Sequence, residues 1–220
     1  MKTNEEIKLI AKSTIETEAK SIFKLVDFVD EELVKVVQRL LQNSGRLVIT
    51  GIGKSANIAQ KLVATFNSTG QPALFMHAAD AIHGDLGNVQ AEDVVMLISK
   101  SGNTSEIKSL LPLLKDMGND LVAMTGNTNS FLAKQSDYVL NTSVEKEACP
   151  NNLAPTSSTT AQLVMGDALA VCLLECRNFS DVDFARFHPG GVLGKRLFLK
   201  VSDLCAQHES PKVPVDADLK

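Results

Sequence analysis

Residues 94–117 read VVMLISKSGNTSEIKSLLPLLKDM, and they contain the three parts from which this fold is expected to be built. The run Val94–Ser99 is short and apolar, which is typical of a strand buried on both faces. The loop that follows is polar and contains Gly102. From Thr104 to Met117, apolar residues return at intervals of three and four, which predicts a helix with one buried face.

The same order of strand, polar loop and helix occurs along much of the chain. Four further runs have the length and composition of buried strands, at Arg46–Thr50, Pro72–His77, Leu121–Thr125 and Tyr138–Asn141. A helix-length segment, Ser55–Ser68, ends before Gly70, which suits a left-handed cap. Because crossovers between parallel strands are right-handed, the sequence predicts a three-layer, doubly wound α/β domain with a five-stranded parallel sheet, as in flavodoxin-like folds.

Two further apolar segments lie outside this repeating unit. Apolar residues recur every three or four positions over residues 22–41, which predicts one long amphipathic N-terminal helix that ends near Gly45. The segment Ala161–Cys176 is almost wholly apolar, but polar residues such as Asp167 interrupt it. It is too short and too polar to span a bilayer, so we expect a buried core helix and no membrane partner.

Composition narrows the classes of function. The chain has 220 residues, a formal net charge of -4, one Tyr and no Trp. It lacks the cationic face and the aromatic side chains that bind nucleic acids, so no nucleic-acid partner is expected. Residues 1–20 carry acidic side chains and no apolar core with a cleavage site, which predicts a cytoplasmic protein. The four cysteines form no CxxC pair, so we expect reduced thiols and no metal site.

The loop after the first strand reads GIGKSA at residues 51–56. A P-loop would need a glycine where Val48 stands, so that motif is excluded. A dinucleotide-binding loop would need an acidic residue at the end of the second strand, and Asp80 lies three positions beyond it. A sugar-phosphate loop would use Lys54 and Ser55 to meet an anion or a hydroxyl group. A tight turn with a solvated lysine explains the loop equally well, so this loop alone leaves the alternatives open.

The loop SKSGNTS at residues 99–105 is more informative. It offers four hydroxyl side chains between the most apolar strand and a clear helix. Unpaired backbone N–H groups and the helix dipole both favour an anion at such a position. Capping would need only one hydroxyl, so phosphate binding is favoured here. Capping alone explains the similar hydroxyl cluster at residues 155–160.

Four titratable side chains lie in or beside these loops. Glu106 begins the helix that follows residue 105, and it is either a surface acid that complements the helix dipole or a base that faces the site. Glu147 lies in an irregular segment, where a carboxylate can serve as a general base, although most loop glutamates are only solvated. His83 and His188 lie in glycine-rich turns, from which a histidine can reach a ligand.

In their order, the motifs resemble the sugar isomerase (SIS) domain family, and within it the arabinose 5-phosphate isomerases of the KpsF/GutQ type. The resemblance extends from about Gly45 to Ser202. It rests on seven motifs, which are GIGKS at 51–55, HGDLG at 83–87, ISKSG at 98–102, KEACP at 146–150, LAPTSSTT at 153–160, MGDAL at 165–169 and HPGG at 188–191. Each motif is weak alone, but seven in the same order are specific.

The resemblance implies reversible conversion of D-ribulose 5-phosphate to D-arabinose 5-phosphate without a cofactor or a metal ion, at the entry to 3-deoxy-D-manno-octulosonate (Kdo) for lipopolysaccharide or capsule. It also implies a homotetramer whose sites draw residues from neighbouring subunits. The family positions that match are Lys54, Glu106, Glu147 and His188, with His83 close to the same site. The residues expected to bind the substrate and its phosphate are Gly53, Ser55, Ser99, Ser101, Asn103, Thr104, Ser157, Ser158 and Thr159.

Isomerisation through an enediol needs a base that takes a proton from one sugar carbon and returns it to the next. We assign this role to Glu147, with Glu106 as its rival. His188 is expected to move the oxygen-bound protons, and Lys54 to stabilise the developing enediolate. The phosphate anchors the substrate away from the reacting carbons and so helps to orient them.

Two features depart from the pattern of that family. Many relatives carry Asn in place of Lys100 and an acidic residue in place of Asn103, so the phosphate loop is more cationic here. Many also continue into a pair of CBS regulatory modules, and residues 201–204 resemble the start of that extension. We therefore expect an SIS domain at residues 1–200 and a C-terminal tail at residues 201–220.

Other functions stay open at this point. A non-catalytic sugar-phosphate sensor is the weaker alternative, because no helix-turn-helix precedes the domain and both glutamates and His188 are present. A dinucleotide-dependent oxidoreductase and an isomerase for another sugar phosphate are further alternatives. CMP-Kdo is a candidate feedback ligand, on which the sequence is silent.

Overall fold

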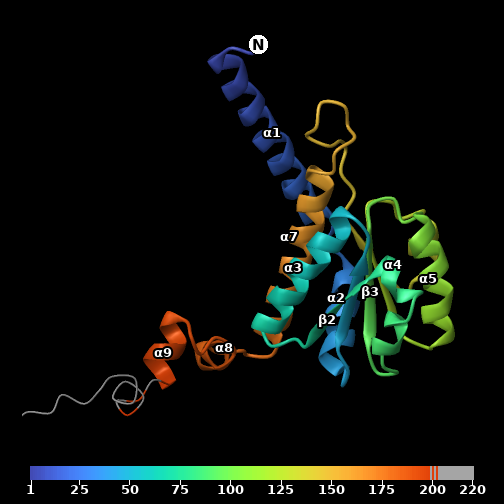
Figure 1. The fold of residues 1–220 in the computed structure, drawn as a ribbon, viewed down its shortest axis with the longest axis vertical. Coiled ribbons are helices and arrows are strands. Elements are labelled where there is room, and N and C mark those ends of the chain that lie inside the picture. The colour runs from blue at the N-terminus through green and yellow to red at the C-terminus, as the bar shows by residue number, and fades with distance from the viewer. Residues whose placement is uncertain (199, 201, 203–220) are drawn as a thin grey trace, which may run out of the picture. The chain divides into compact units, whose positions relative to one another are not determined.

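The computed structural model describes residues 1–198, 200 and 202. The chain forms two compact units, Met1–Asn178 and Phe179–Lys220. The first unit is built on a five-stranded parallel sheet with the order β2-β1-β3-β4-β5, which confirms the predicted flavodoxin-like arrangement (Figure 1). Its strands are β1 (Leu47–Gly51), β2 (Ala73–His77), β3 (Val94–Ser99), β4 (Leu121–Thr125) and β5 (Tyr138–Asn141).

Helices cover both faces of this sheet, as predicted for three layers. One face packs against α2 (Glu31–Gln42), α3 (Lys54–Ser68) and α7 (Ser157–Cys176). The other packs against α4 (Ala78–Ala81), α5 (Ser105–Asp116) and α6 (Phe131–Gln135). A 3-10 helix, η2 (Asp85–Asn88), follows α4.

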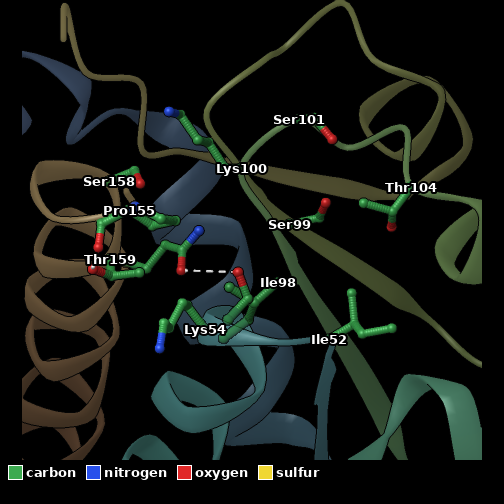
Figure 2. A pocket seen from close by; sticks show the side chains of 12 residues that line it. Ile52, Lys54, Ile98, Ser99, Lys100, Ser101, Thr104, Pro155, Ser158 and Thr159 are labelled. Carbon is green, nitrogen blue, oxygen red and sulfur yellow. Dashed lines mark hydrogen bonds between the residues drawn. The ribbon is translucent and has the colours of Figure 1, made fainter. Parts of the chain in front are cut away.

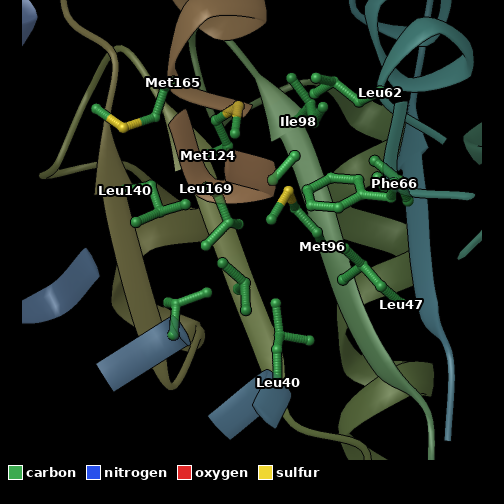
Figure 3. Packing of buried hydrophobic residues seen from close by; sticks show 14 of the residues in the cluster. Leu40, Leu47, Leu62, Phe66, Met96, Ile98, Met124, Leu140, Met165 and Leu169 are labelled. Carbon is green, nitrogen blue, oxygen red and sulfur yellow. The ribbon is translucent and has the colours of Figure 1, made fainter. Parts of the chain in front are cut away.

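The central strand β3 shows why both layers are needed. Every residue of β3 is buried, and successive side chains alternate between the two faces. Met96 and Ile98 contact the α2, α3 and α7 layer, together with Phe66 and Leu169 (Figure 3). Val95 and Leu97 point to the opposite face of the sheet and contact the α4, α5 and α6 layer. The predicted bounds of all five strands and of α3 and α5 agree with the structure to within one residue.

The N-terminal region differs from the prediction of one helix over residues 22–41. Instead α1 (Asn4–Lys24) is followed by a 3-10 helix, η1 (Leu25–Phe28), and α2 begins after Asp30. The Asp30 carboxylate accepts a hydrogen bond from the N–H group of Glu32 at 3.0 Å and caps α2. Because an N-cap residue has an extended backbone, local capping overrides the apolar periodicity at this point.

This break changes which apolar side chains are covered. Leu25 and Leu33 are buried, as the periodicity predicts, but Val26 is 66% and Val29 is 53% exposed. The N-terminal half of α1 extends beyond the sheet, and residues 4–13 are exposed (Figure 1). A long N-terminal helix is therefore present, but it ends at Lys24, near the start of the predicted segment, and a second helix, α2, forms most of the remainder.

The helix α7 is the core helix predicted from its apolar composition. Among the described helices it alone is long and apolar enough to cross a membrane. It packs against α1, α2 and α3, which accounts for its buried apolar residues. Gly166 lies where α7 packs tightly against α3, since a Cβ at this position would overlap the side chain of Leu62.

The second unit begins with two short helices, α8 (Asp181–Phe187) and α9 (Val192–Phe198). Ser180 and Asp183 form a capping box at the start of α8. The predicted tail at residues 201–220 lies outside the described residues, apart from Ser202. The expected domain limit near residue 200 stays a prediction.

Candidate functional site

The carboxyl ends of β1 and β3 lie side by side, because these strands are parallel neighbours. A cavity of about 250 Å³ opens at this edge, between the loops that follow the two strands and the start of α7 (Figure 2). Three of the loops predicted to bind a ligand therefore meet here. The lining residues are Ile52, Lys54, Ser55, Ile98, Ser99, Lys100, Ser101, Thr104, Pro155, Ser158, Thr159 and Gln162.

The glycine-rich loop turns β1 into α3. Gly53 is the N-cap of α3, and its φ of +58° is a left-handed conformation that favours glycine. No side chain caps this helix end, so the N–H groups of its first turn face no competing side chain. Lys54 is exposed, lines the cavity and forms no ion pair with any residue in the described part of the chain. The hydroxyl of Ser55 donates to Oε1 of Gln162 at 3.3 Å (Figure 2).

The hydroxyl-rich loop after β3 is folded by its own side chains. Ser99 Oγ accepts from the N–H group of Gly102 at 3.1 Å, and Ser101 Oγ accepts from that of Asn103 at 3.2 Å. Thr104 is the N-cap of α5, but its hydroxyl is buried and has no hydrogen-bond partner among the described residues. The first N–H groups of α5 are therefore uncapped beside the cavity, where an anion is favoured.

Two of the predicted residues in this loop and at the start of α5 do not line the cavity. Asn103 ties the loop to α6, because its Oδ1 accepts from the N–H group of Phe131 at 3.0 Å. Glu106 is half-buried in the first turn of α5, where it accepts from the hydroxyl of Ser105 at 3.0 Å. Loop-to-loop contacts and helix ends use the same residue types as ligand sites, which is why the sequence alone did not separate these roles.

Glu147 is a buried and fully bonded carboxylate next to the cavity, with only 2% of its surface exposed. Its Oε1 accepts from Nζ of Lys100 at 2.6 Å. Its Oε2 accepts from the N–H groups of Thr156 at 2.8 Å and Ser158 at 3.1 Å. The carboxylate thus joins the loop after β3 to the start of α7, and these are two walls of the cavity.

These contacts decide the protonation state of Glu147. Burial by itself raises the pKa of this carboxyl group, because it disfavours the charged form. The Lys100 ammonium, the Ser158 hydroxyl and the N–H groups of Thr156 and Ser158 outweigh burial and lower the pKa from 4.5 to about 2. Glu147 is therefore charged at neutral pH, and it is a weak base as long as Lys100 stays paired with it.

The start of α7 supplies the third wall. Ser158 and Thr159 line the cavity, as predicted, whereas Ser157 is fully buried and does not. The hydroxyl of Thr159 donates to the carbonyl oxygen of Thr156 at 2.9 Å. The buried hydroxyl of Ser158 makes no well-aligned hydrogen bond among the described residues, but it helps to lower the pKa of the Glu147 carboxyl group.

The two predicted histidines belong to other parts of the chain. His83 is exposed in the turn between α4 and η2 and is not among the lining residues. His188 follows α8 in the second unit, where its ring stacks on Phe184 and its Nδ1 lies 2.9 Å from the Phe184 carbonyl oxygen. A carbonyl oxygen only accepts, so Nδ1 is the donor in this bond.

Sequence reasoning missed Gln162 as a site residue and assigned no contact to Lys100. Gln162 is 1% exposed and lines the cavity. A single amide within an almost wholly apolar helix was the signal that could have found it, since a buried amide needs a polar partner. Lys100 was expected only to make its loop more cationic. Its contact with Glu147 was missed because the two residues are 47 positions apart in the chain.

The charges of the lining indicate the kind of ligand. Two lysines and no acidic residue line the cavity. Within the described residues, no three His, Cys, Asp or Glu side chains gather closely enough to hold a metal ion. Cations, hydroxyl groups and uncapped helix N-termini together favour an anion such as phosphate attached to a polyhydroxylated group.

Known proteins are similar to this chain in sequence and in fold. The SIS domain family matches residues 40–172. Arabinose 5-phosphate isomerase KdsD of Pseudomonas aeruginosa is 50% identical over 194 residues, which are 88% of this chain and 60% of the relative. Arabinose 5-phosphate isomerase KpsF of Escherichia coli is 47% identical over 186 residues, which are 84% of this chain and 58% of the relative. The chain thus spans about 60% of the length of these curated relatives.

A solved structure matches over a larger share of its own length. A protein of E. coli CFT073, solved in complex with arabinose 5-phosphate, superposes with a TM-score of 0.83 at 41% sequence identity. The match covers 86% of this chain and 100% of that protein. The matched fold therefore extends over the whole of that solved chain.

Proposed function

Because the chain belongs to the SIS domain family, we propose that it is an aldose–ketose isomerase that interconverts D-ribulose 5-phosphate and D-arabinose 5-phosphate. The names of the curated relatives support this substrate pair. The observation that carries the proposal is the cavity, which two lysines and six hydroxyl-bearing residues line without any carboxylate. In the cytoplasm, the product would feed Kdo synthesis for lipopolysaccharide or capsule.

The phosphate group accounts for the polar groups that have no partner. The hydroxyl of Thr104 is buried and unbonded among the described residues, and Lys54 lacks an ion pair there. A phosphate at the uncapped start of α5 would satisfy these donors and complement the helix dipole. Binding energy from this remote group would then orient the reacting carbons.

The reaction itself moves two protons and needs no external oxidant or reductant. Starting from the aldose, a base takes the proton from C2, the C2–H electron pair forms the C1–C2 double bond, and the carbonyl oxygen at C1 becomes a hydroxyl. The enediol then gains a proton at C1 and loses one from the oxygen at C2, which yields the ketose. A group that accepts and donates protons at oxygen and a cation near the developing negative charge would both accelerate these steps.

We assign these roles to residues of this chain. Glu147 is the proposed base, and Glu106 is the alternative. Lys54 stabilises the enediolate, since its ammonium lines the cavity without a counter-ion among the described residues. His188 moves the oxygen-bound protons, a role that suits a histidine whose Nδ1 is held by a backbone carbonyl oxygen. His83 is proposed as a further catalytic residue at the edge of the site.

The test is incubation of the purified protein with ribulose 5-phosphate, followed by detection of arabinose 5-phosphate. Conversion is expected for the wild type and a large loss for Glu147→Gln. Glu145→Gln is the matched control, because Glu145 is exposed and pairs with Lys24 rather than with a cavity residue. Failure of the folded wild type to convert the substrate refutes the function. Full activity of Glu147→Gln together with loss in Glu106→Gln reassigns the base.

We further propose that the active form is a homotetramer. Support comes from apolar side chains left uncovered on α1 and η1, of which Phe23 is 79% and Val26 is 66% exposed. An apolar hollow of about 250 Å³ lies beside them, lined by residues that include Val29 and Val164. Exposed apolar surface of this kind is typical of subunit interfaces.

CMP-Kdo, a nucleotide-linked end product of the proposed pathway, is a candidate feedback ligand. An anionic nucleotide sugar would compete with phosphate for the same lysines, Lys54 and Lys100. Inhibition that rises in parallel with displacement of bound phosphate is the expected result. Inhibition without displacement would require a second site.

A further inference from the structure

Lys100 stands between two possible anionic partners. Its Nζ lies 2.6 Å from Oε1 of Glu147, whose side chain is 0% exposed, whereas the Lys100 side chain is 46% exposed. The same lysine also lines the cavity (Figure 2). Lys100 is therefore bonded through its ammonium to a buried carboxylate and is also part of the lining of the proposed phosphate site.

The carboxylate of Glu147 does not depend on Lys100 alone. Its Oε2 accepts from two backbone N–H groups, those of Thr156 and Ser158, and from the hydroxyl of Thr156 at 3.2 Å. Only Oε1 is held by the ammonium. If Lys100 moved, the carboxylate would keep its position and its charge would still be stabilised on one oxygen. The lysine stem has four rotatable carbons, so such a movement needs no change of backbone.

The cavity supplies a reason for the movement. A phosphate monoester carries close to two negative charges at neutral pH, and the lining holds no acidic residue to oppose it. Lys54 alone neutralises at most half of that charge. The nearest further cation in the lining is Lys100.

We propose that Lys100 is a further substrate-binding residue that exchanges partners, holding Glu147 while the cavity is empty and moving to the substrate phosphate when the cavity is filled. This inference rests on the proposed function, because it assumes a phosphorylated ligand. Its consequence is that Glu147 becomes a competent base only when substrate is present. The low pKa of Glu147 in the empty site agrees with this order of events.

Binding of inorganic phosphate tests the exchange without any turnover. Lys100 must leave Glu147 to meet phosphate, and Glu147→Gln removes the competing charge. Phosphate should therefore bind to Glu147→Gln on the order of tenfold more tightly than to the wild type, as measured by calorimetry. In a Lys100→Met background, the same Glu147→Gln change should have little effect. Glu145→Gln removes a neighbouring exposed charge that does not contact Lys100, and it should also have little effect.

Several outcomes would overturn the inference. One is phosphate affinity that is unchanged or weaker in Glu147→Gln. Another is an equal gain in the presence and absence of Lys100, which would mean that only the general loss of negative charge matters. If Glu147→Gln does not fold, the Lys100→Met variant alone tests the exchange. The exchange requires Lys100→Met to bind phosphate about tenfold more weakly than the wild type, and an unchanged affinity contradicts it.

The two proposals can fail separately. Phosphate binding that follows the expected pattern without conversion of ribulose 5-phosphate would refute the proposed function and keep the partner exchange. Conversion with no coupling between Lys100 and Glu147 in phosphate binding would keep the function and refute the exchange. Lys100→Arg supplies a further readout, because it retains the charge and should recover part of the phosphate affinity lost in Lys100→Met.

Discussion

The hydroxyl of Ser55 donates to Oε1 of Gln162 at 3.3 Å, and this bond joins the start of α3 to α7 across the cavity. The two residues are 107 positions apart in the chain. Gln162 is buried in a largely apolar helix, so its amide is held by the site and not by solvent. The bond orients a hydroxyl that lines the proposed substrate site.

Loss of this bond should weaken substrate binding. In Gln162→Leu, Ser55 loses its acceptor, and we expect KM for ribulose 5-phosphate to rise about threefold to tenfold, corresponding to about 1 kcal/mol for one hydrogen bond. Steady-state kinetics and thermal unfolding would be measured together. Ser55→Ala should have a similar effect, and the double variant should be little worse than either single one. Fully additive losses would show that the two side chains act independently.

Glu147 should make the fold sensitive to acid. Its pKa is lowered from 4.5 to about 2 in the folded protein, so the carboxylate stabilises the fold by about 3 kcal/mol at neutral pH. This stabilisation is present above a pH of about 4.5 and is lost as the pH falls towards about 2. Glu147→Gln should therefore unfold at lower denaturant concentration than the wild type at pH 7, and the difference should shrink between these two pH values.

Glu145→Gln is the control for the acid effect. Glu145 is exposed and its ion pair with Lys24 is screened by solvent, so this change should alter stability little at any pH. A gap between wild type and Glu147→Gln that is the same at pH 7 and pH 3 would contradict the lowered pKa of Glu147.

The close approach of α3 and α7 predicts a loss of stability in Gly166→Ala. Alanine is normally better than glycine inside a helix, by about 1 kcal/mol. Here the added methyl group would overlap the buried side chain of Leu62, and overpacking of this kind costs about 1–3 kcal/mol. We expect net destabilisation in denaturant unfolding. In a Leu62→Ala background the same change should become neutral or stabilising, and a cost that persists there would point to a cause other than this contact.

The uncovered side chains of α1 and η1 predict a defined change in assembly. Val26→Glu places a charge in the exposed apolar hollow and should dissociate the proposed tetramer, as measured by light scattering coupled to size-exclusion chromatography. Leu113→Ser on α5 is the control, because it removes an exposed apolar side chain from the opposite layer of the domain. A Val26→Glu protein that keeps four chains per particle would refute this interface.

Much of the fold follows from local pattern. The five strands are short apolar runs bounded by polar loops, and their bounds were predictable to within one residue because strands buried on both faces leave little choice of composition. Loops at the carboxyl ends of neighbouring parallel strands must meet, so the hydroxyl-rich segments were predictable as one site. The break at Asp30 was not predictable from periodicity, since one capping contact outweighed a continuous apolar pattern.

The sequence by itself determined the layers, the order of the loops and the anionic character of the expected ligand, because these depend on residue types that are close together in the chain. Only the tertiary structure decided which charged and polar side chains are paired. Lys100 and Glu147 are 47 residues apart, and Ser55 and Gln162 are 107 apart, so no local pattern reports their contact. The strength of a carboxylate as a base depends on burial and on partners a few ångströms away, and packing of distant segments determines both.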